Sequence, residues 1–308
     1  MDIKLWGVRG STPSPGAETV KYGGNTTCIG IDFGPDEKEA IIDGGTGIRL
    51  LGNHLMKKYQ PDNVIDVNIF ITHTHWDHIL GFPFFAPIYN PLTKLTIYGP
   101  VAHEEGGLDD IIGSQLQYKY FPVIESELDA DIKYFPLKET SFILGKNITV
   151  KTKHVNHSVI CISYRFEHNG KVFCFTTDSE PFRNIFAADP SLSSDYDKFI
   201  SEEGEKTAAE ENRKISDFFK GADLLVHDAQ YTNEEWKREK LGWGHASIED
   251  VIEAAAAAGV KRLILTHHDP ERTDEQIDQL TDFYYKKYAD INKKMPFGFA
   301  QEGSVITL

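Results

Sequence analysis

The chain has 308 residues, and its 32 lysines and arginines against 47 aspartates and glutamates give a formal net charge of −15. This balance argues against a general nucleic-acid-binding protein, which normally presents a basic face. The sequence contains no run of 18 apolar residues and no start typical of a signal peptide, so we expect neither a membrane span nor secretion. Three cysteines without paired spacing, Cys28, Cys161 and Cys174, read as buried thiols of a reducing compartment, and the cytoplasm is the expected location.

The first part of the chain alternates apolar strands with one clear helix. Strands are predicted at residues 3–8, 27–32, 40–43 and 67–71. A helix is predicted at 47–58, because Leu50, Leu51, His54 and Leu55 recur on one face. We therefore read His54 as a packed helix residue.

The stretch His73-Thr74-His75-Trp76-Asp77-His78 follows the strand predicted at 67–71 and is the densest chemical signal in the chain. It places three imidazoles and one carboxylate within six residues, and these are ligand types that Zn²⁺ and similar cations prefer. Side chains alternate along a strand, so His73 and His75 share a face. Asp77 and His78 follow the turn and can face a second ion.

Further ligand-type residues each follow an apolar, strand-like run: Asp43, His157, Asp178 and His267. Strand ends that converge on one site are how α/β folds commonly build active sites. His154 lies three residues before His157 and is an alternative ligand. We prefer His157 because it directly precedes the strand predicted at 159–166.

The second half of the chain continues the alternation. A strand is predicted at 148–153, and Asn169-Gly170 predicts a tight hairpin turn between strands at 164–168 and 171–176. An acidic, polar segment around 189–213 predicts a surface insertion or a helical excursion. Strands at 224–226 and 261–265, helices at 248–258 and 274–287, and a strand at 304–308 complete a single domain spanning 1–308.

The order of these motifs resembles the metallo-β-lactamase superfamily over nearly the whole chain. The resemblance implies an α/β (α+β) fold, a four-layer αββα sandwich, with two divalent metal ions side by side. Zinc is the expected ion, with manganese or iron as alternatives. The resemblance implies that the first metal is held by His73, His75 and His157, and the second by Asp77, His78 and His267. Asp178 would bridge the two, and Asp43 would orient the site by hydrogen bonds.

Two more motifs, Leu224-Leu225-Val226-His227-Asp228-Ala229 and Gly242-Trp243-Gly244-His245-Ala246-Ser247, resemble transfer-RNA 3′-processing endonucleases and class II cyclic-nucleotide phosphodiesterases. In that branch a carboxylate at the position of Asp228 pairs with a histidine at the position of His245, and the pair protonates the leaving oxygen. The family's nucleases often carry Glu at the position of Asp228. Asp77, His245 and Asp228 are thus the expected catalytic residues. Ser247 also predicts a helix N-cap, which is compatible with a catalytic His245.

We therefore expect a metal-dependent hydrolase, a dinuclear phosphodiesterase acting on a small, cyclic nucleotide. A transfer-RNA 3′-endonuclease is an alternative, although the Gly/Pro-rich basic arm of the family's nucleases is missing. A thioesterase of the glyoxalase II type is a second alternative, although its basic C-terminal helical region is absent. A non-hydrolytic di-iron sensor module is a third, although redox members of the superfamily usually have Glu at the position of His75.

The expected partner is a small phosphodiester; neither DNA nor a membrane is expected, RNA is disfavoured, and a homodimer stays open. Three features of the sequence could either contact the substrate or have a purely structural role. Arg9 and Arg272 could contact a phosphate or form ion pairs. The aromatic segment 118–122 could form a lid or pack in the core.

Overall fold

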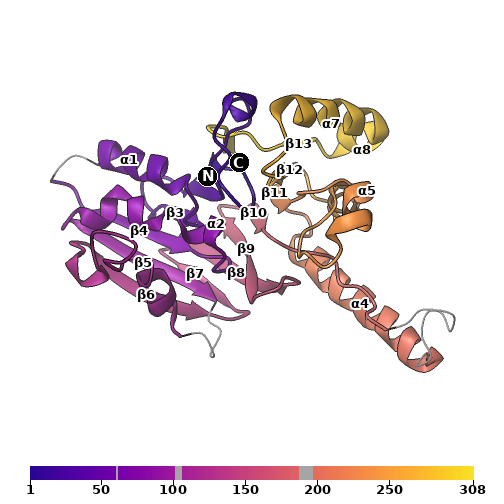
Figure 1. Cartoon of the computed structure of the whole chain (residues 1–308), viewed down its shortest axis with the longest axis horizontal. Coiled ribbons are helices and arrows are strands. Elements are labelled where there is room, and N and C mark those ends of the chain that lie inside the picture. Colours follow the sequence, from indigo (N-terminus) through magenta and orange to yellow (C-terminus); the bar gives the residue numbers. More distant parts are fainter. Residues whose placement is uncertain (60–61, 101–105, 187–196) are drawn as a thin grey trace.

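Two seven-stranded sheets pack face to face, with helices on both outer faces (Figure 1). The computed structural model describes residues 1–59, 62–100, 106–186 and 197–308. The αββα sandwich predicted from the sequence is confirmed. None of the helices among the described residues combines the length and the apolar composition that a membrane span requires.

The first sheet pairs the two ends of the chain and continues through its first half. Its order is β14 (Val305–Thr307), β1 (Asp2–Gly7), β2 (Cys28–Asp32), β3 (Ala40–Ile42), β4 (Ile65–Phe70), β5 (Thr93–Pro100) and β6 (Asp131–Leu137). Strands β3 to β6 run parallel, and the other pairings are antiparallel. Helix α1 (Ile48–Lys58) packs Leu51 and Leu55 into the outer apolar cluster of this sheet.

The second sheet contains the rest of the strands. Its order is β13 (Phe297–Phe299), β12 (Leu263–Thr266), β11 (Leu224–Asp228), β10 (Lys171–Thr176), β9 (Cys161–His168), β8 (Ile148–Val155) and β7 (Ser141–Leu144). Strands β10 to β13 run parallel. Helices α6 (Ile248–Ala257) and α7 (Asp274–Lys287) contribute Val251, Ile252 and Tyr284 to the apolar cluster on its outer face.

The main core lies between the sheets, where alternate side chains of facing strands meet. Phe70 of β4 packs edge-on against Tyr164 and Phe166 of β9, with ring centroids 5.3 and 5.2 Å apart. Burying each such large apolar side chain stabilises the fold by about 1.5–3 kcal/mol. Every strand and helix predicted from the sequence has its counterpart, with ends that differ by three residues or fewer.

The predicted hairpin turn is confirmed by its backbone. Asn169 and Gly170 have φ values of 50° and 72°, the left-handed conformation that a type I′ turn requires at both central residues. Strands β9 and β10 pair antiparallel on either side, with His168 opposite Lys171.

Helix α4 (Lys198–Phe218) extends away from the sandwich (Figure 1). Its N-cap is Asp197, whose side chain accepts hydrogen bonds from the backbone N–H groups of Phe199 and Ile200. The part of the predicted acidic insertion that the structure describes is thus helical, and residues 189–196 of that prediction lie outside the described residues. The remaining short helices are α2 (Trp76–Ile79), α3 (Leu108–Gly113), α5 (Asn233–Glu235) with a π-helical turn after it (Trp236–Lys240), and α8 (Ala289–Lys294).

Candidate metal centre

The residues predicted as metal ligands come together where parallel strands of both sheets end. Asp43 follows β3, His73 follows β4, Asp178 follows β10 and His267 follows β12. His157 lies in the connection between β8 and β9. Carboxyl ends of parallel strands meet at one edge of a sheet, so Asp77 and His267 become neighbours although they are 190 positions apart.

The first group of converging ligand atoms consists of His73, His75, His157 and Asp178. His75 Nδ1 lies 3.0 Å from His73 Nε2 and 3.1 Å from His157 Nε2. Asp178 Oδ2 lies 3.5 Å from His73 Nε2 and 3.9 Å from His157 Nε2. We call this group the first ligand set.

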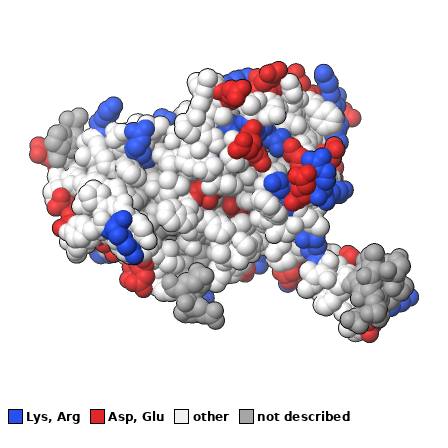
Figure 2. All heavy atoms as spheres, viewed as in Figure 1, with Lys and Arg blue, Asp and Glu red and all other residues white. Residues whose placement is uncertain are grey.

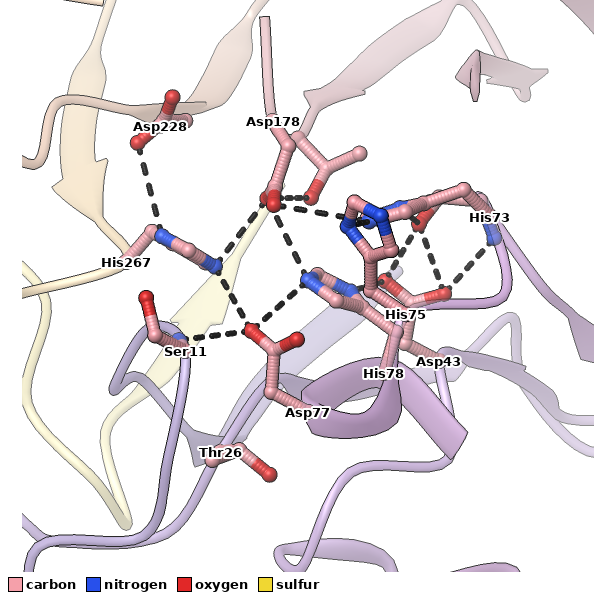
Figure 3. Close-up of polar contacts among 12 residues, drawn as sticks. Ser11, Thr26, Asp43, His73, His75, Asp77, His78, Asp178, Asp228 and His267 are labelled. Carbon is pink, nitrogen blue, oxygen red and sulfur yellow. Dashed lines mark hydrogen bonds and ion pairs between the residues drawn. The ribbon is translucent and has the colours of Figure 1, made fainter. Parts of the chain in front are cut away.

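The second ligand set consists of Asp77, His78, His267 and the same Asp178. His78 Nε2 lies 3.2 Å from Asp77 Oδ2 and 3.3 Å from Asp178 Oδ1. His267 Nε2 is 3.1 Å from each of these oxygens. Asp178 therefore turns Oδ2 toward the first set and Oδ1 toward the second, and Figure 3 shows it between His73, His78 and His267.

The chain turns sharply within the ligand motif and thereby separates the two sets. Helix α2 begins at Trp76, and His75 precedes it in an extended conformation. The helical turn brings Asp77 and His78 into the buried interior, while the Trp76 side chain between them and His75 remains 74% exposed. One short motif can thus supply ligands to two neighbouring sites.

Hydrogen bonds behind the histidines orient their rings. Nδ1–H of His78 donates to Asp43 Oδ2 at 2.8 Å, and Nδ1–H of His157 donates to the Gly244 carbonyl at 3.0 Å. Nδ1–H of His267 donates to Gln230 Oε1 at 3.3 Å. With the proton held on Nδ1, the Nε2 lone pair of each ring points to the centre, as ligating histidines require.

The spacing of the ligand atoms suits bound divalent cations better than direct contacts between the ligands. Imidazole nitrogens only about 3 Å apart need a shared proton or a cation between them. Bonds of about 2.0–2.1 Å at tetrahedral angles around zinc would separate two ligand nitrogens by about 3.3 Å. His78 Nε2 is buried without a hydrogen-bond partner, although two carboxylate oxygens lie nearby.

The charges of the centre support the same fit. Burial raises the pKa of Asp178, but His267, His78 and His73 outweigh burial and hold that pKa well below its usual range. Burial lowers the pKa of His78, but Asp77, Asp178 and Asp43 outweigh burial and raise it well above its usual value. In the described part of the chain, no lysine or arginine forms an ion pair with Asp43, Asp77, Asp178 or Asp228. Buried carboxylates with only histidines as counter-charges suit a cation site.

The backbone around the centre is held in strained conformations. Of the four non-glycine residues with left-handed φ in the described chain, three lie here: Ser11 at 60°, Asp43 at 61° and His267 at 64°. Such conformations cost about 1–3 kcal/mol each and persist where the surroundings fix them. The strain at Ser11 directs its backbone N–H to Asp77 Oδ2 at 2.7 Å.

His245 and Asp228 lie beside the second ligand set. His245 Nδ1 is 3.2 Å from Asp228 Oδ2, which also accepts a hydrogen bond from the Ala246 backbone at 3.1 Å. The ring of His245 stacks on that of His267, with centroids 5.0 Å apart. Burial lowers the pKa of His245, but Asp228 and Asp178 outweigh burial and raise the pKa to about 9.

Asp228, His245 and His267 also offer three ligand atoms close to one another. Asp228 Oδ2 contacts His245 Nδ1 and accepts from the Ala246 backbone N–H, which is the arrangement that the sequence predicted for a proton-donating pair. Ser247 caps α6 by accepting from the Asp250 backbone, so the N-cap and the pair coexist as expected.

The structure places the two candidate arginines in structural roles. Arg9 is fully buried, and its guanidinium donates to the carbonyls of Gly23, Asp269 and Arg272. Arg272 donates to the Gln230 carbonyl and pairs with Glu235 at 2.8 Å. In the aromatic segment 118–122, Tyr118 and Tyr120 are exposed, so they are not core residues. His154 does not belong to either ligand set, in line with the preference for His157.

Sequence reasoning missed several residues that contact the ligands. Gln230 is buried and joins His267 to Ser11, whose hydroxyl accepts from Gln230 Nε2 at 3.3 Å. Thr72 donates from both its backbone N–H and its hydroxyl to Asp43. Gln230 stands two residues after Asp228, and Thr72 stands directly before His73. Their position beside a motif is the feature of the sequence from which they could have been identified.

Comparison with known proteins agrees with this geometry. The profile of a family described as "Beta-lactamase superfamily domain" matches residues 38–190 and 207–268, which is more than half of the chain. A protein named ribonuclease Z from Ignicoccus hospitalis is 28% identical over 76% of this chain and 80% of its own length. A ribonuclease Z from Lactococcus lactis subsp. cremoris is 30% identical over 69% of this chain and 74% of its own.

Among solved structures, unliganded yeast PDE1 shares the fold with a TM-score of 0.62 at 16% identity, covering 100% of this chain and 99% of that one. The family match, the relatives and the two ligand sets lead to one conclusion. The chain belongs to the metallo-β-lactamase superfamily of metal-dependent hydrolases, in the branch that contains the ribonuclease Z relatives.

Proposed function

We propose that this enzyme hydrolyses a phosphodiester with two divalent cations, one at each ligand set. The observation that carries the proposal is Asp178, whose two carboxylate oxygens face different sets. When bound, two such cations lower the pKa of a shared water from 15.7 to about 7 and neutralise charge on the phosphoryl oxygens. Zinc is the proposed ion because histidine and carboxylate ligands suit it, and manganese or iron accept the same ligands.

The ligand sets would give the site a positive charge within an acidic protein. Asp77 and Asp178 are the only carboxylates in the two sets, and together they contribute two negative charges against four positive ones. The surplus attracts an anionic phosphodiester although the whole chain carries −15.

In this proposal His245 protonates the leaving oxygen. During hydrolysis the oxygen of water bonds to phosphorus, the bond from phosphorus to the leaving oxygen breaks, and that oxygen takes up a proton. Asp228 accepts from Nδ1 of His245, so the Nε2–H is free to donate. The raised pKa of about 9 keeps His245 protonated at neutral pH, and cations at the neighbouring sets would lower that pKa toward neutrality, where general acids work best.

Two features support a small nucleotide as the substrate. Trp76 is 74% exposed and lies in the sequence between His75 of the first set and Asp77 of the second. Trp243 is 58% exposed and directly precedes Gly244 and His245. Exposed aromatic rings at a site favour stacking with a nucleobase, worth about 1–3 kcal/mol per base. On the face shown in Figure 2, lysines and arginines lie among aspartates and glutamates. The described residues of this face form no continuous basic band.

Cleavage of a transfer-RNA precursor is the second candidate. The observation that favours it is the set of relatives named ribonuclease Z, of which the two described above match over 80% and 74% of their own length. The same metal centre and the same His245–Asp228 pair would serve either phosphodiester, so the substrate alone distinguishes the two candidates.

We expect a higher kcat/KM for a cyclic nucleotide than for a transfer-RNA precursor. A long RNA brings many phosphates against a protein of charge −15, and their repulsion acts over about 10 Å at 0.1 M salt. A cyclic nucleotide brings one phosphate to the centre. Both substrates are to be measured under identical metal and salt conditions.

A salt series provides the control for this comparison. If charge repulsion disfavours RNA, a higher salt concentration should raise kcat/KM for the transfer-RNA precursor and bring it closer to the value for the cyclic nucleotide. A clear preference for the precursor at physiological salt would reverse the ranking and promote the endonuclease reading.

A further inference from the structure

Glu180 is a buried carboxylate that takes no part in either ligand set. It lies two residues after Asp178, and the residue is only 4% exposed. Its Oε1 accepts from the Gly242 backbone N–H and its Oε2 from the Gly244 backbone N–H, both at 3.0 Å. Arg183 Nε also donates to Oε1 at 3.0 Å, but the Arg183 side chain is 39% exposed, so this pair is the weaker contribution.

The loop 242–244 can receive this carboxylate because of its backbone conformation. Gly242 and Gly244 have φ values of 86° and 84°, which L side chains rarely adopt. Gly244 is needed for space as well, since a Cβ atom there would lie 2.2 Å from His157 Nδ1. At Gly242 the nearest atom to an added Cβ is 3.9 Å away.

The same loop touches both functional parts of the site. The Gly244 carbonyl accepts from His157 Nδ1 and so orients a ligand of the first set. The next residue, His245, is the proton donor that pairs with Asp228. The backbone N–H of Glu180 donates to the Asn156 carbonyl at 2.9 Å, directly before His157. Glu180 is thus hydrogen-bonded to both segments that present His157 and His245.

We infer that Glu180 is a positioning residue: its carboxylate fixes the loop 242–244 and thereby sets the places of His245 and His157. This inference rests on the proposed function for its effect on turnover. The Glu180 carboxylate is a charged acceptor for the N–H of the buried Gly244 and of the exposed Gly242, and removing it leaves the buried Gly244 N–H without its partner. The loop would then relax, and misplacement of catalytic groups by about 1 Å can cost about 10²-fold in rate.

The test compares Glu180→Ala and Glu180→Gln with Glu249→Gln as a matched control. Glu249 is also buried and accepts from the Asn233 backbone N–H and from Lys287 Nζ, and among the described residues no hydrogen bond joins it to the loop 242–244. With metal in excess, Glu180→Ala should lower kcat for a cyclic nucleotide by about 10–100-fold, with a smaller loss on a nitrophenyl phosphodiester. Glu180→Gln keeps one acceptor oxygen and should lose less, and Glu249→Gln should behave like the unmodified protein.

Two readouts do not depend on turnover. Amide hydrogen exchange of the segment 241–246 should speed up at least tenfold in Glu180→Ala, measured without metal, and stay unchanged in Glu249→Gln. Chelator competition should show weaker Zn²⁺ binding in Glu180→Ala because His157 loses its fixed Gly244 partner. If the unmodified protein cleaves no phosphodiester, the proposed function fails while these two readouts still decide the role of Glu180.

A purely structural role would give a different result. Unchanged exchange at 241–246 in Glu180→Ala, or equal losses of kcat on both substrates, would overturn the positioning role. If Glu180→Ala does not fold, Glu180→Gln decides by the same two criteria. The pair Gly244→Ala and Gly242→Ala adds an independent check: both share the φ strain, but only Gly244→Ala pushes on His157 and should weaken Zn²⁺ binding more.

Discussion

Replacing Asp178 by alanine is expected to abolish turnover and to release at least one metal ion per chain. One oxygen of this carboxylate faces each ligand set, so both sets lose a donor at once. The remaining ligands would then have to hold two cations that repel each other, with no carboxylate shared between them. Losing several kcal/mol of stabilisation corresponds to a rate loss of about 10³-fold or more. Elemental analysis and steady-state kinetics on the same preparation measure both effects.

Two variants control for folding and for the loss of a carboxylate in general. Asp178→Asn keeps the volume and one donor oxygen, so it should retain more metal than Asp178→Ala. Asp223→Ala removes a mostly buried aspartate that accepts from the Val172 backbone at the opposite end of β10 and β11. It should keep both activity and metal. If Asp178→Ala keeps two ions and normal turnover, its bridging role is wrong.

Replacing His245 by alanine is expected to lower turnover by about 10²–10⁴-fold while metal content stays intact. The loss should be largest on a nucleotide, whose leaving oxygen needs a proton, and smaller on a nitrophenyl phosphodiester, whose leaving group is already acidic. The comparison of the two substrates at saturating metal is the measurement. It separates proton donation from substrate binding, which would affect both substrates alike.

The partner of His245 provides a second check on this assignment. Asp228 acts through His245, so Asp228→Ala combined with His245→Ala should cost little more than His245→Ala alone. A fall in metal content in His245→Ala would instead show that Asp228, His245 and His267 form a metal site of their own.

Much of the fold follows from the sequence because apolar periodicity and turn chemistry are local. The strand at 67–71 and the Asn169-Gly170 turn could be predicted without knowledge of tertiary contacts. Strands β5, β6, β7 and β13 escaped prediction. β5 lies inside its sheet, whereas the other three are edge strands: β6 contains Pro136 and its side chains are mostly exposed, and β7 and β13 have only four and three residues. Edge strands lack the strong apolar pattern that identifies buried ones.

The candidate ligand residues could be predicted because most of them follow an apolar strand directly or lie in the short motif after β4, and parallel strands bring such ends together. The residues that orient them could not. Glu180 and Gln230 act through contacts across 62 and 37 positions, and no local pattern distinguishes them from surface polar residues. The roles of Arg9 and Arg272 were undecided in the sequence because only packing shows that their donors are engaged by carbonyls and Glu235.

The most direct test of a two-ion phosphodiesterase is metal titration of chelator-stripped protein, followed by hydrolysis of bis(p-nitrophenyl) phosphate. The two ligand sets that share Asp178 predict no turnover without metal and a rise that reaches its plateau at two equivalents of Zn²⁺ or Mn²⁺ per chain. Full turnover at one equivalent, or turnover that persists in excess chelator, would contradict the account.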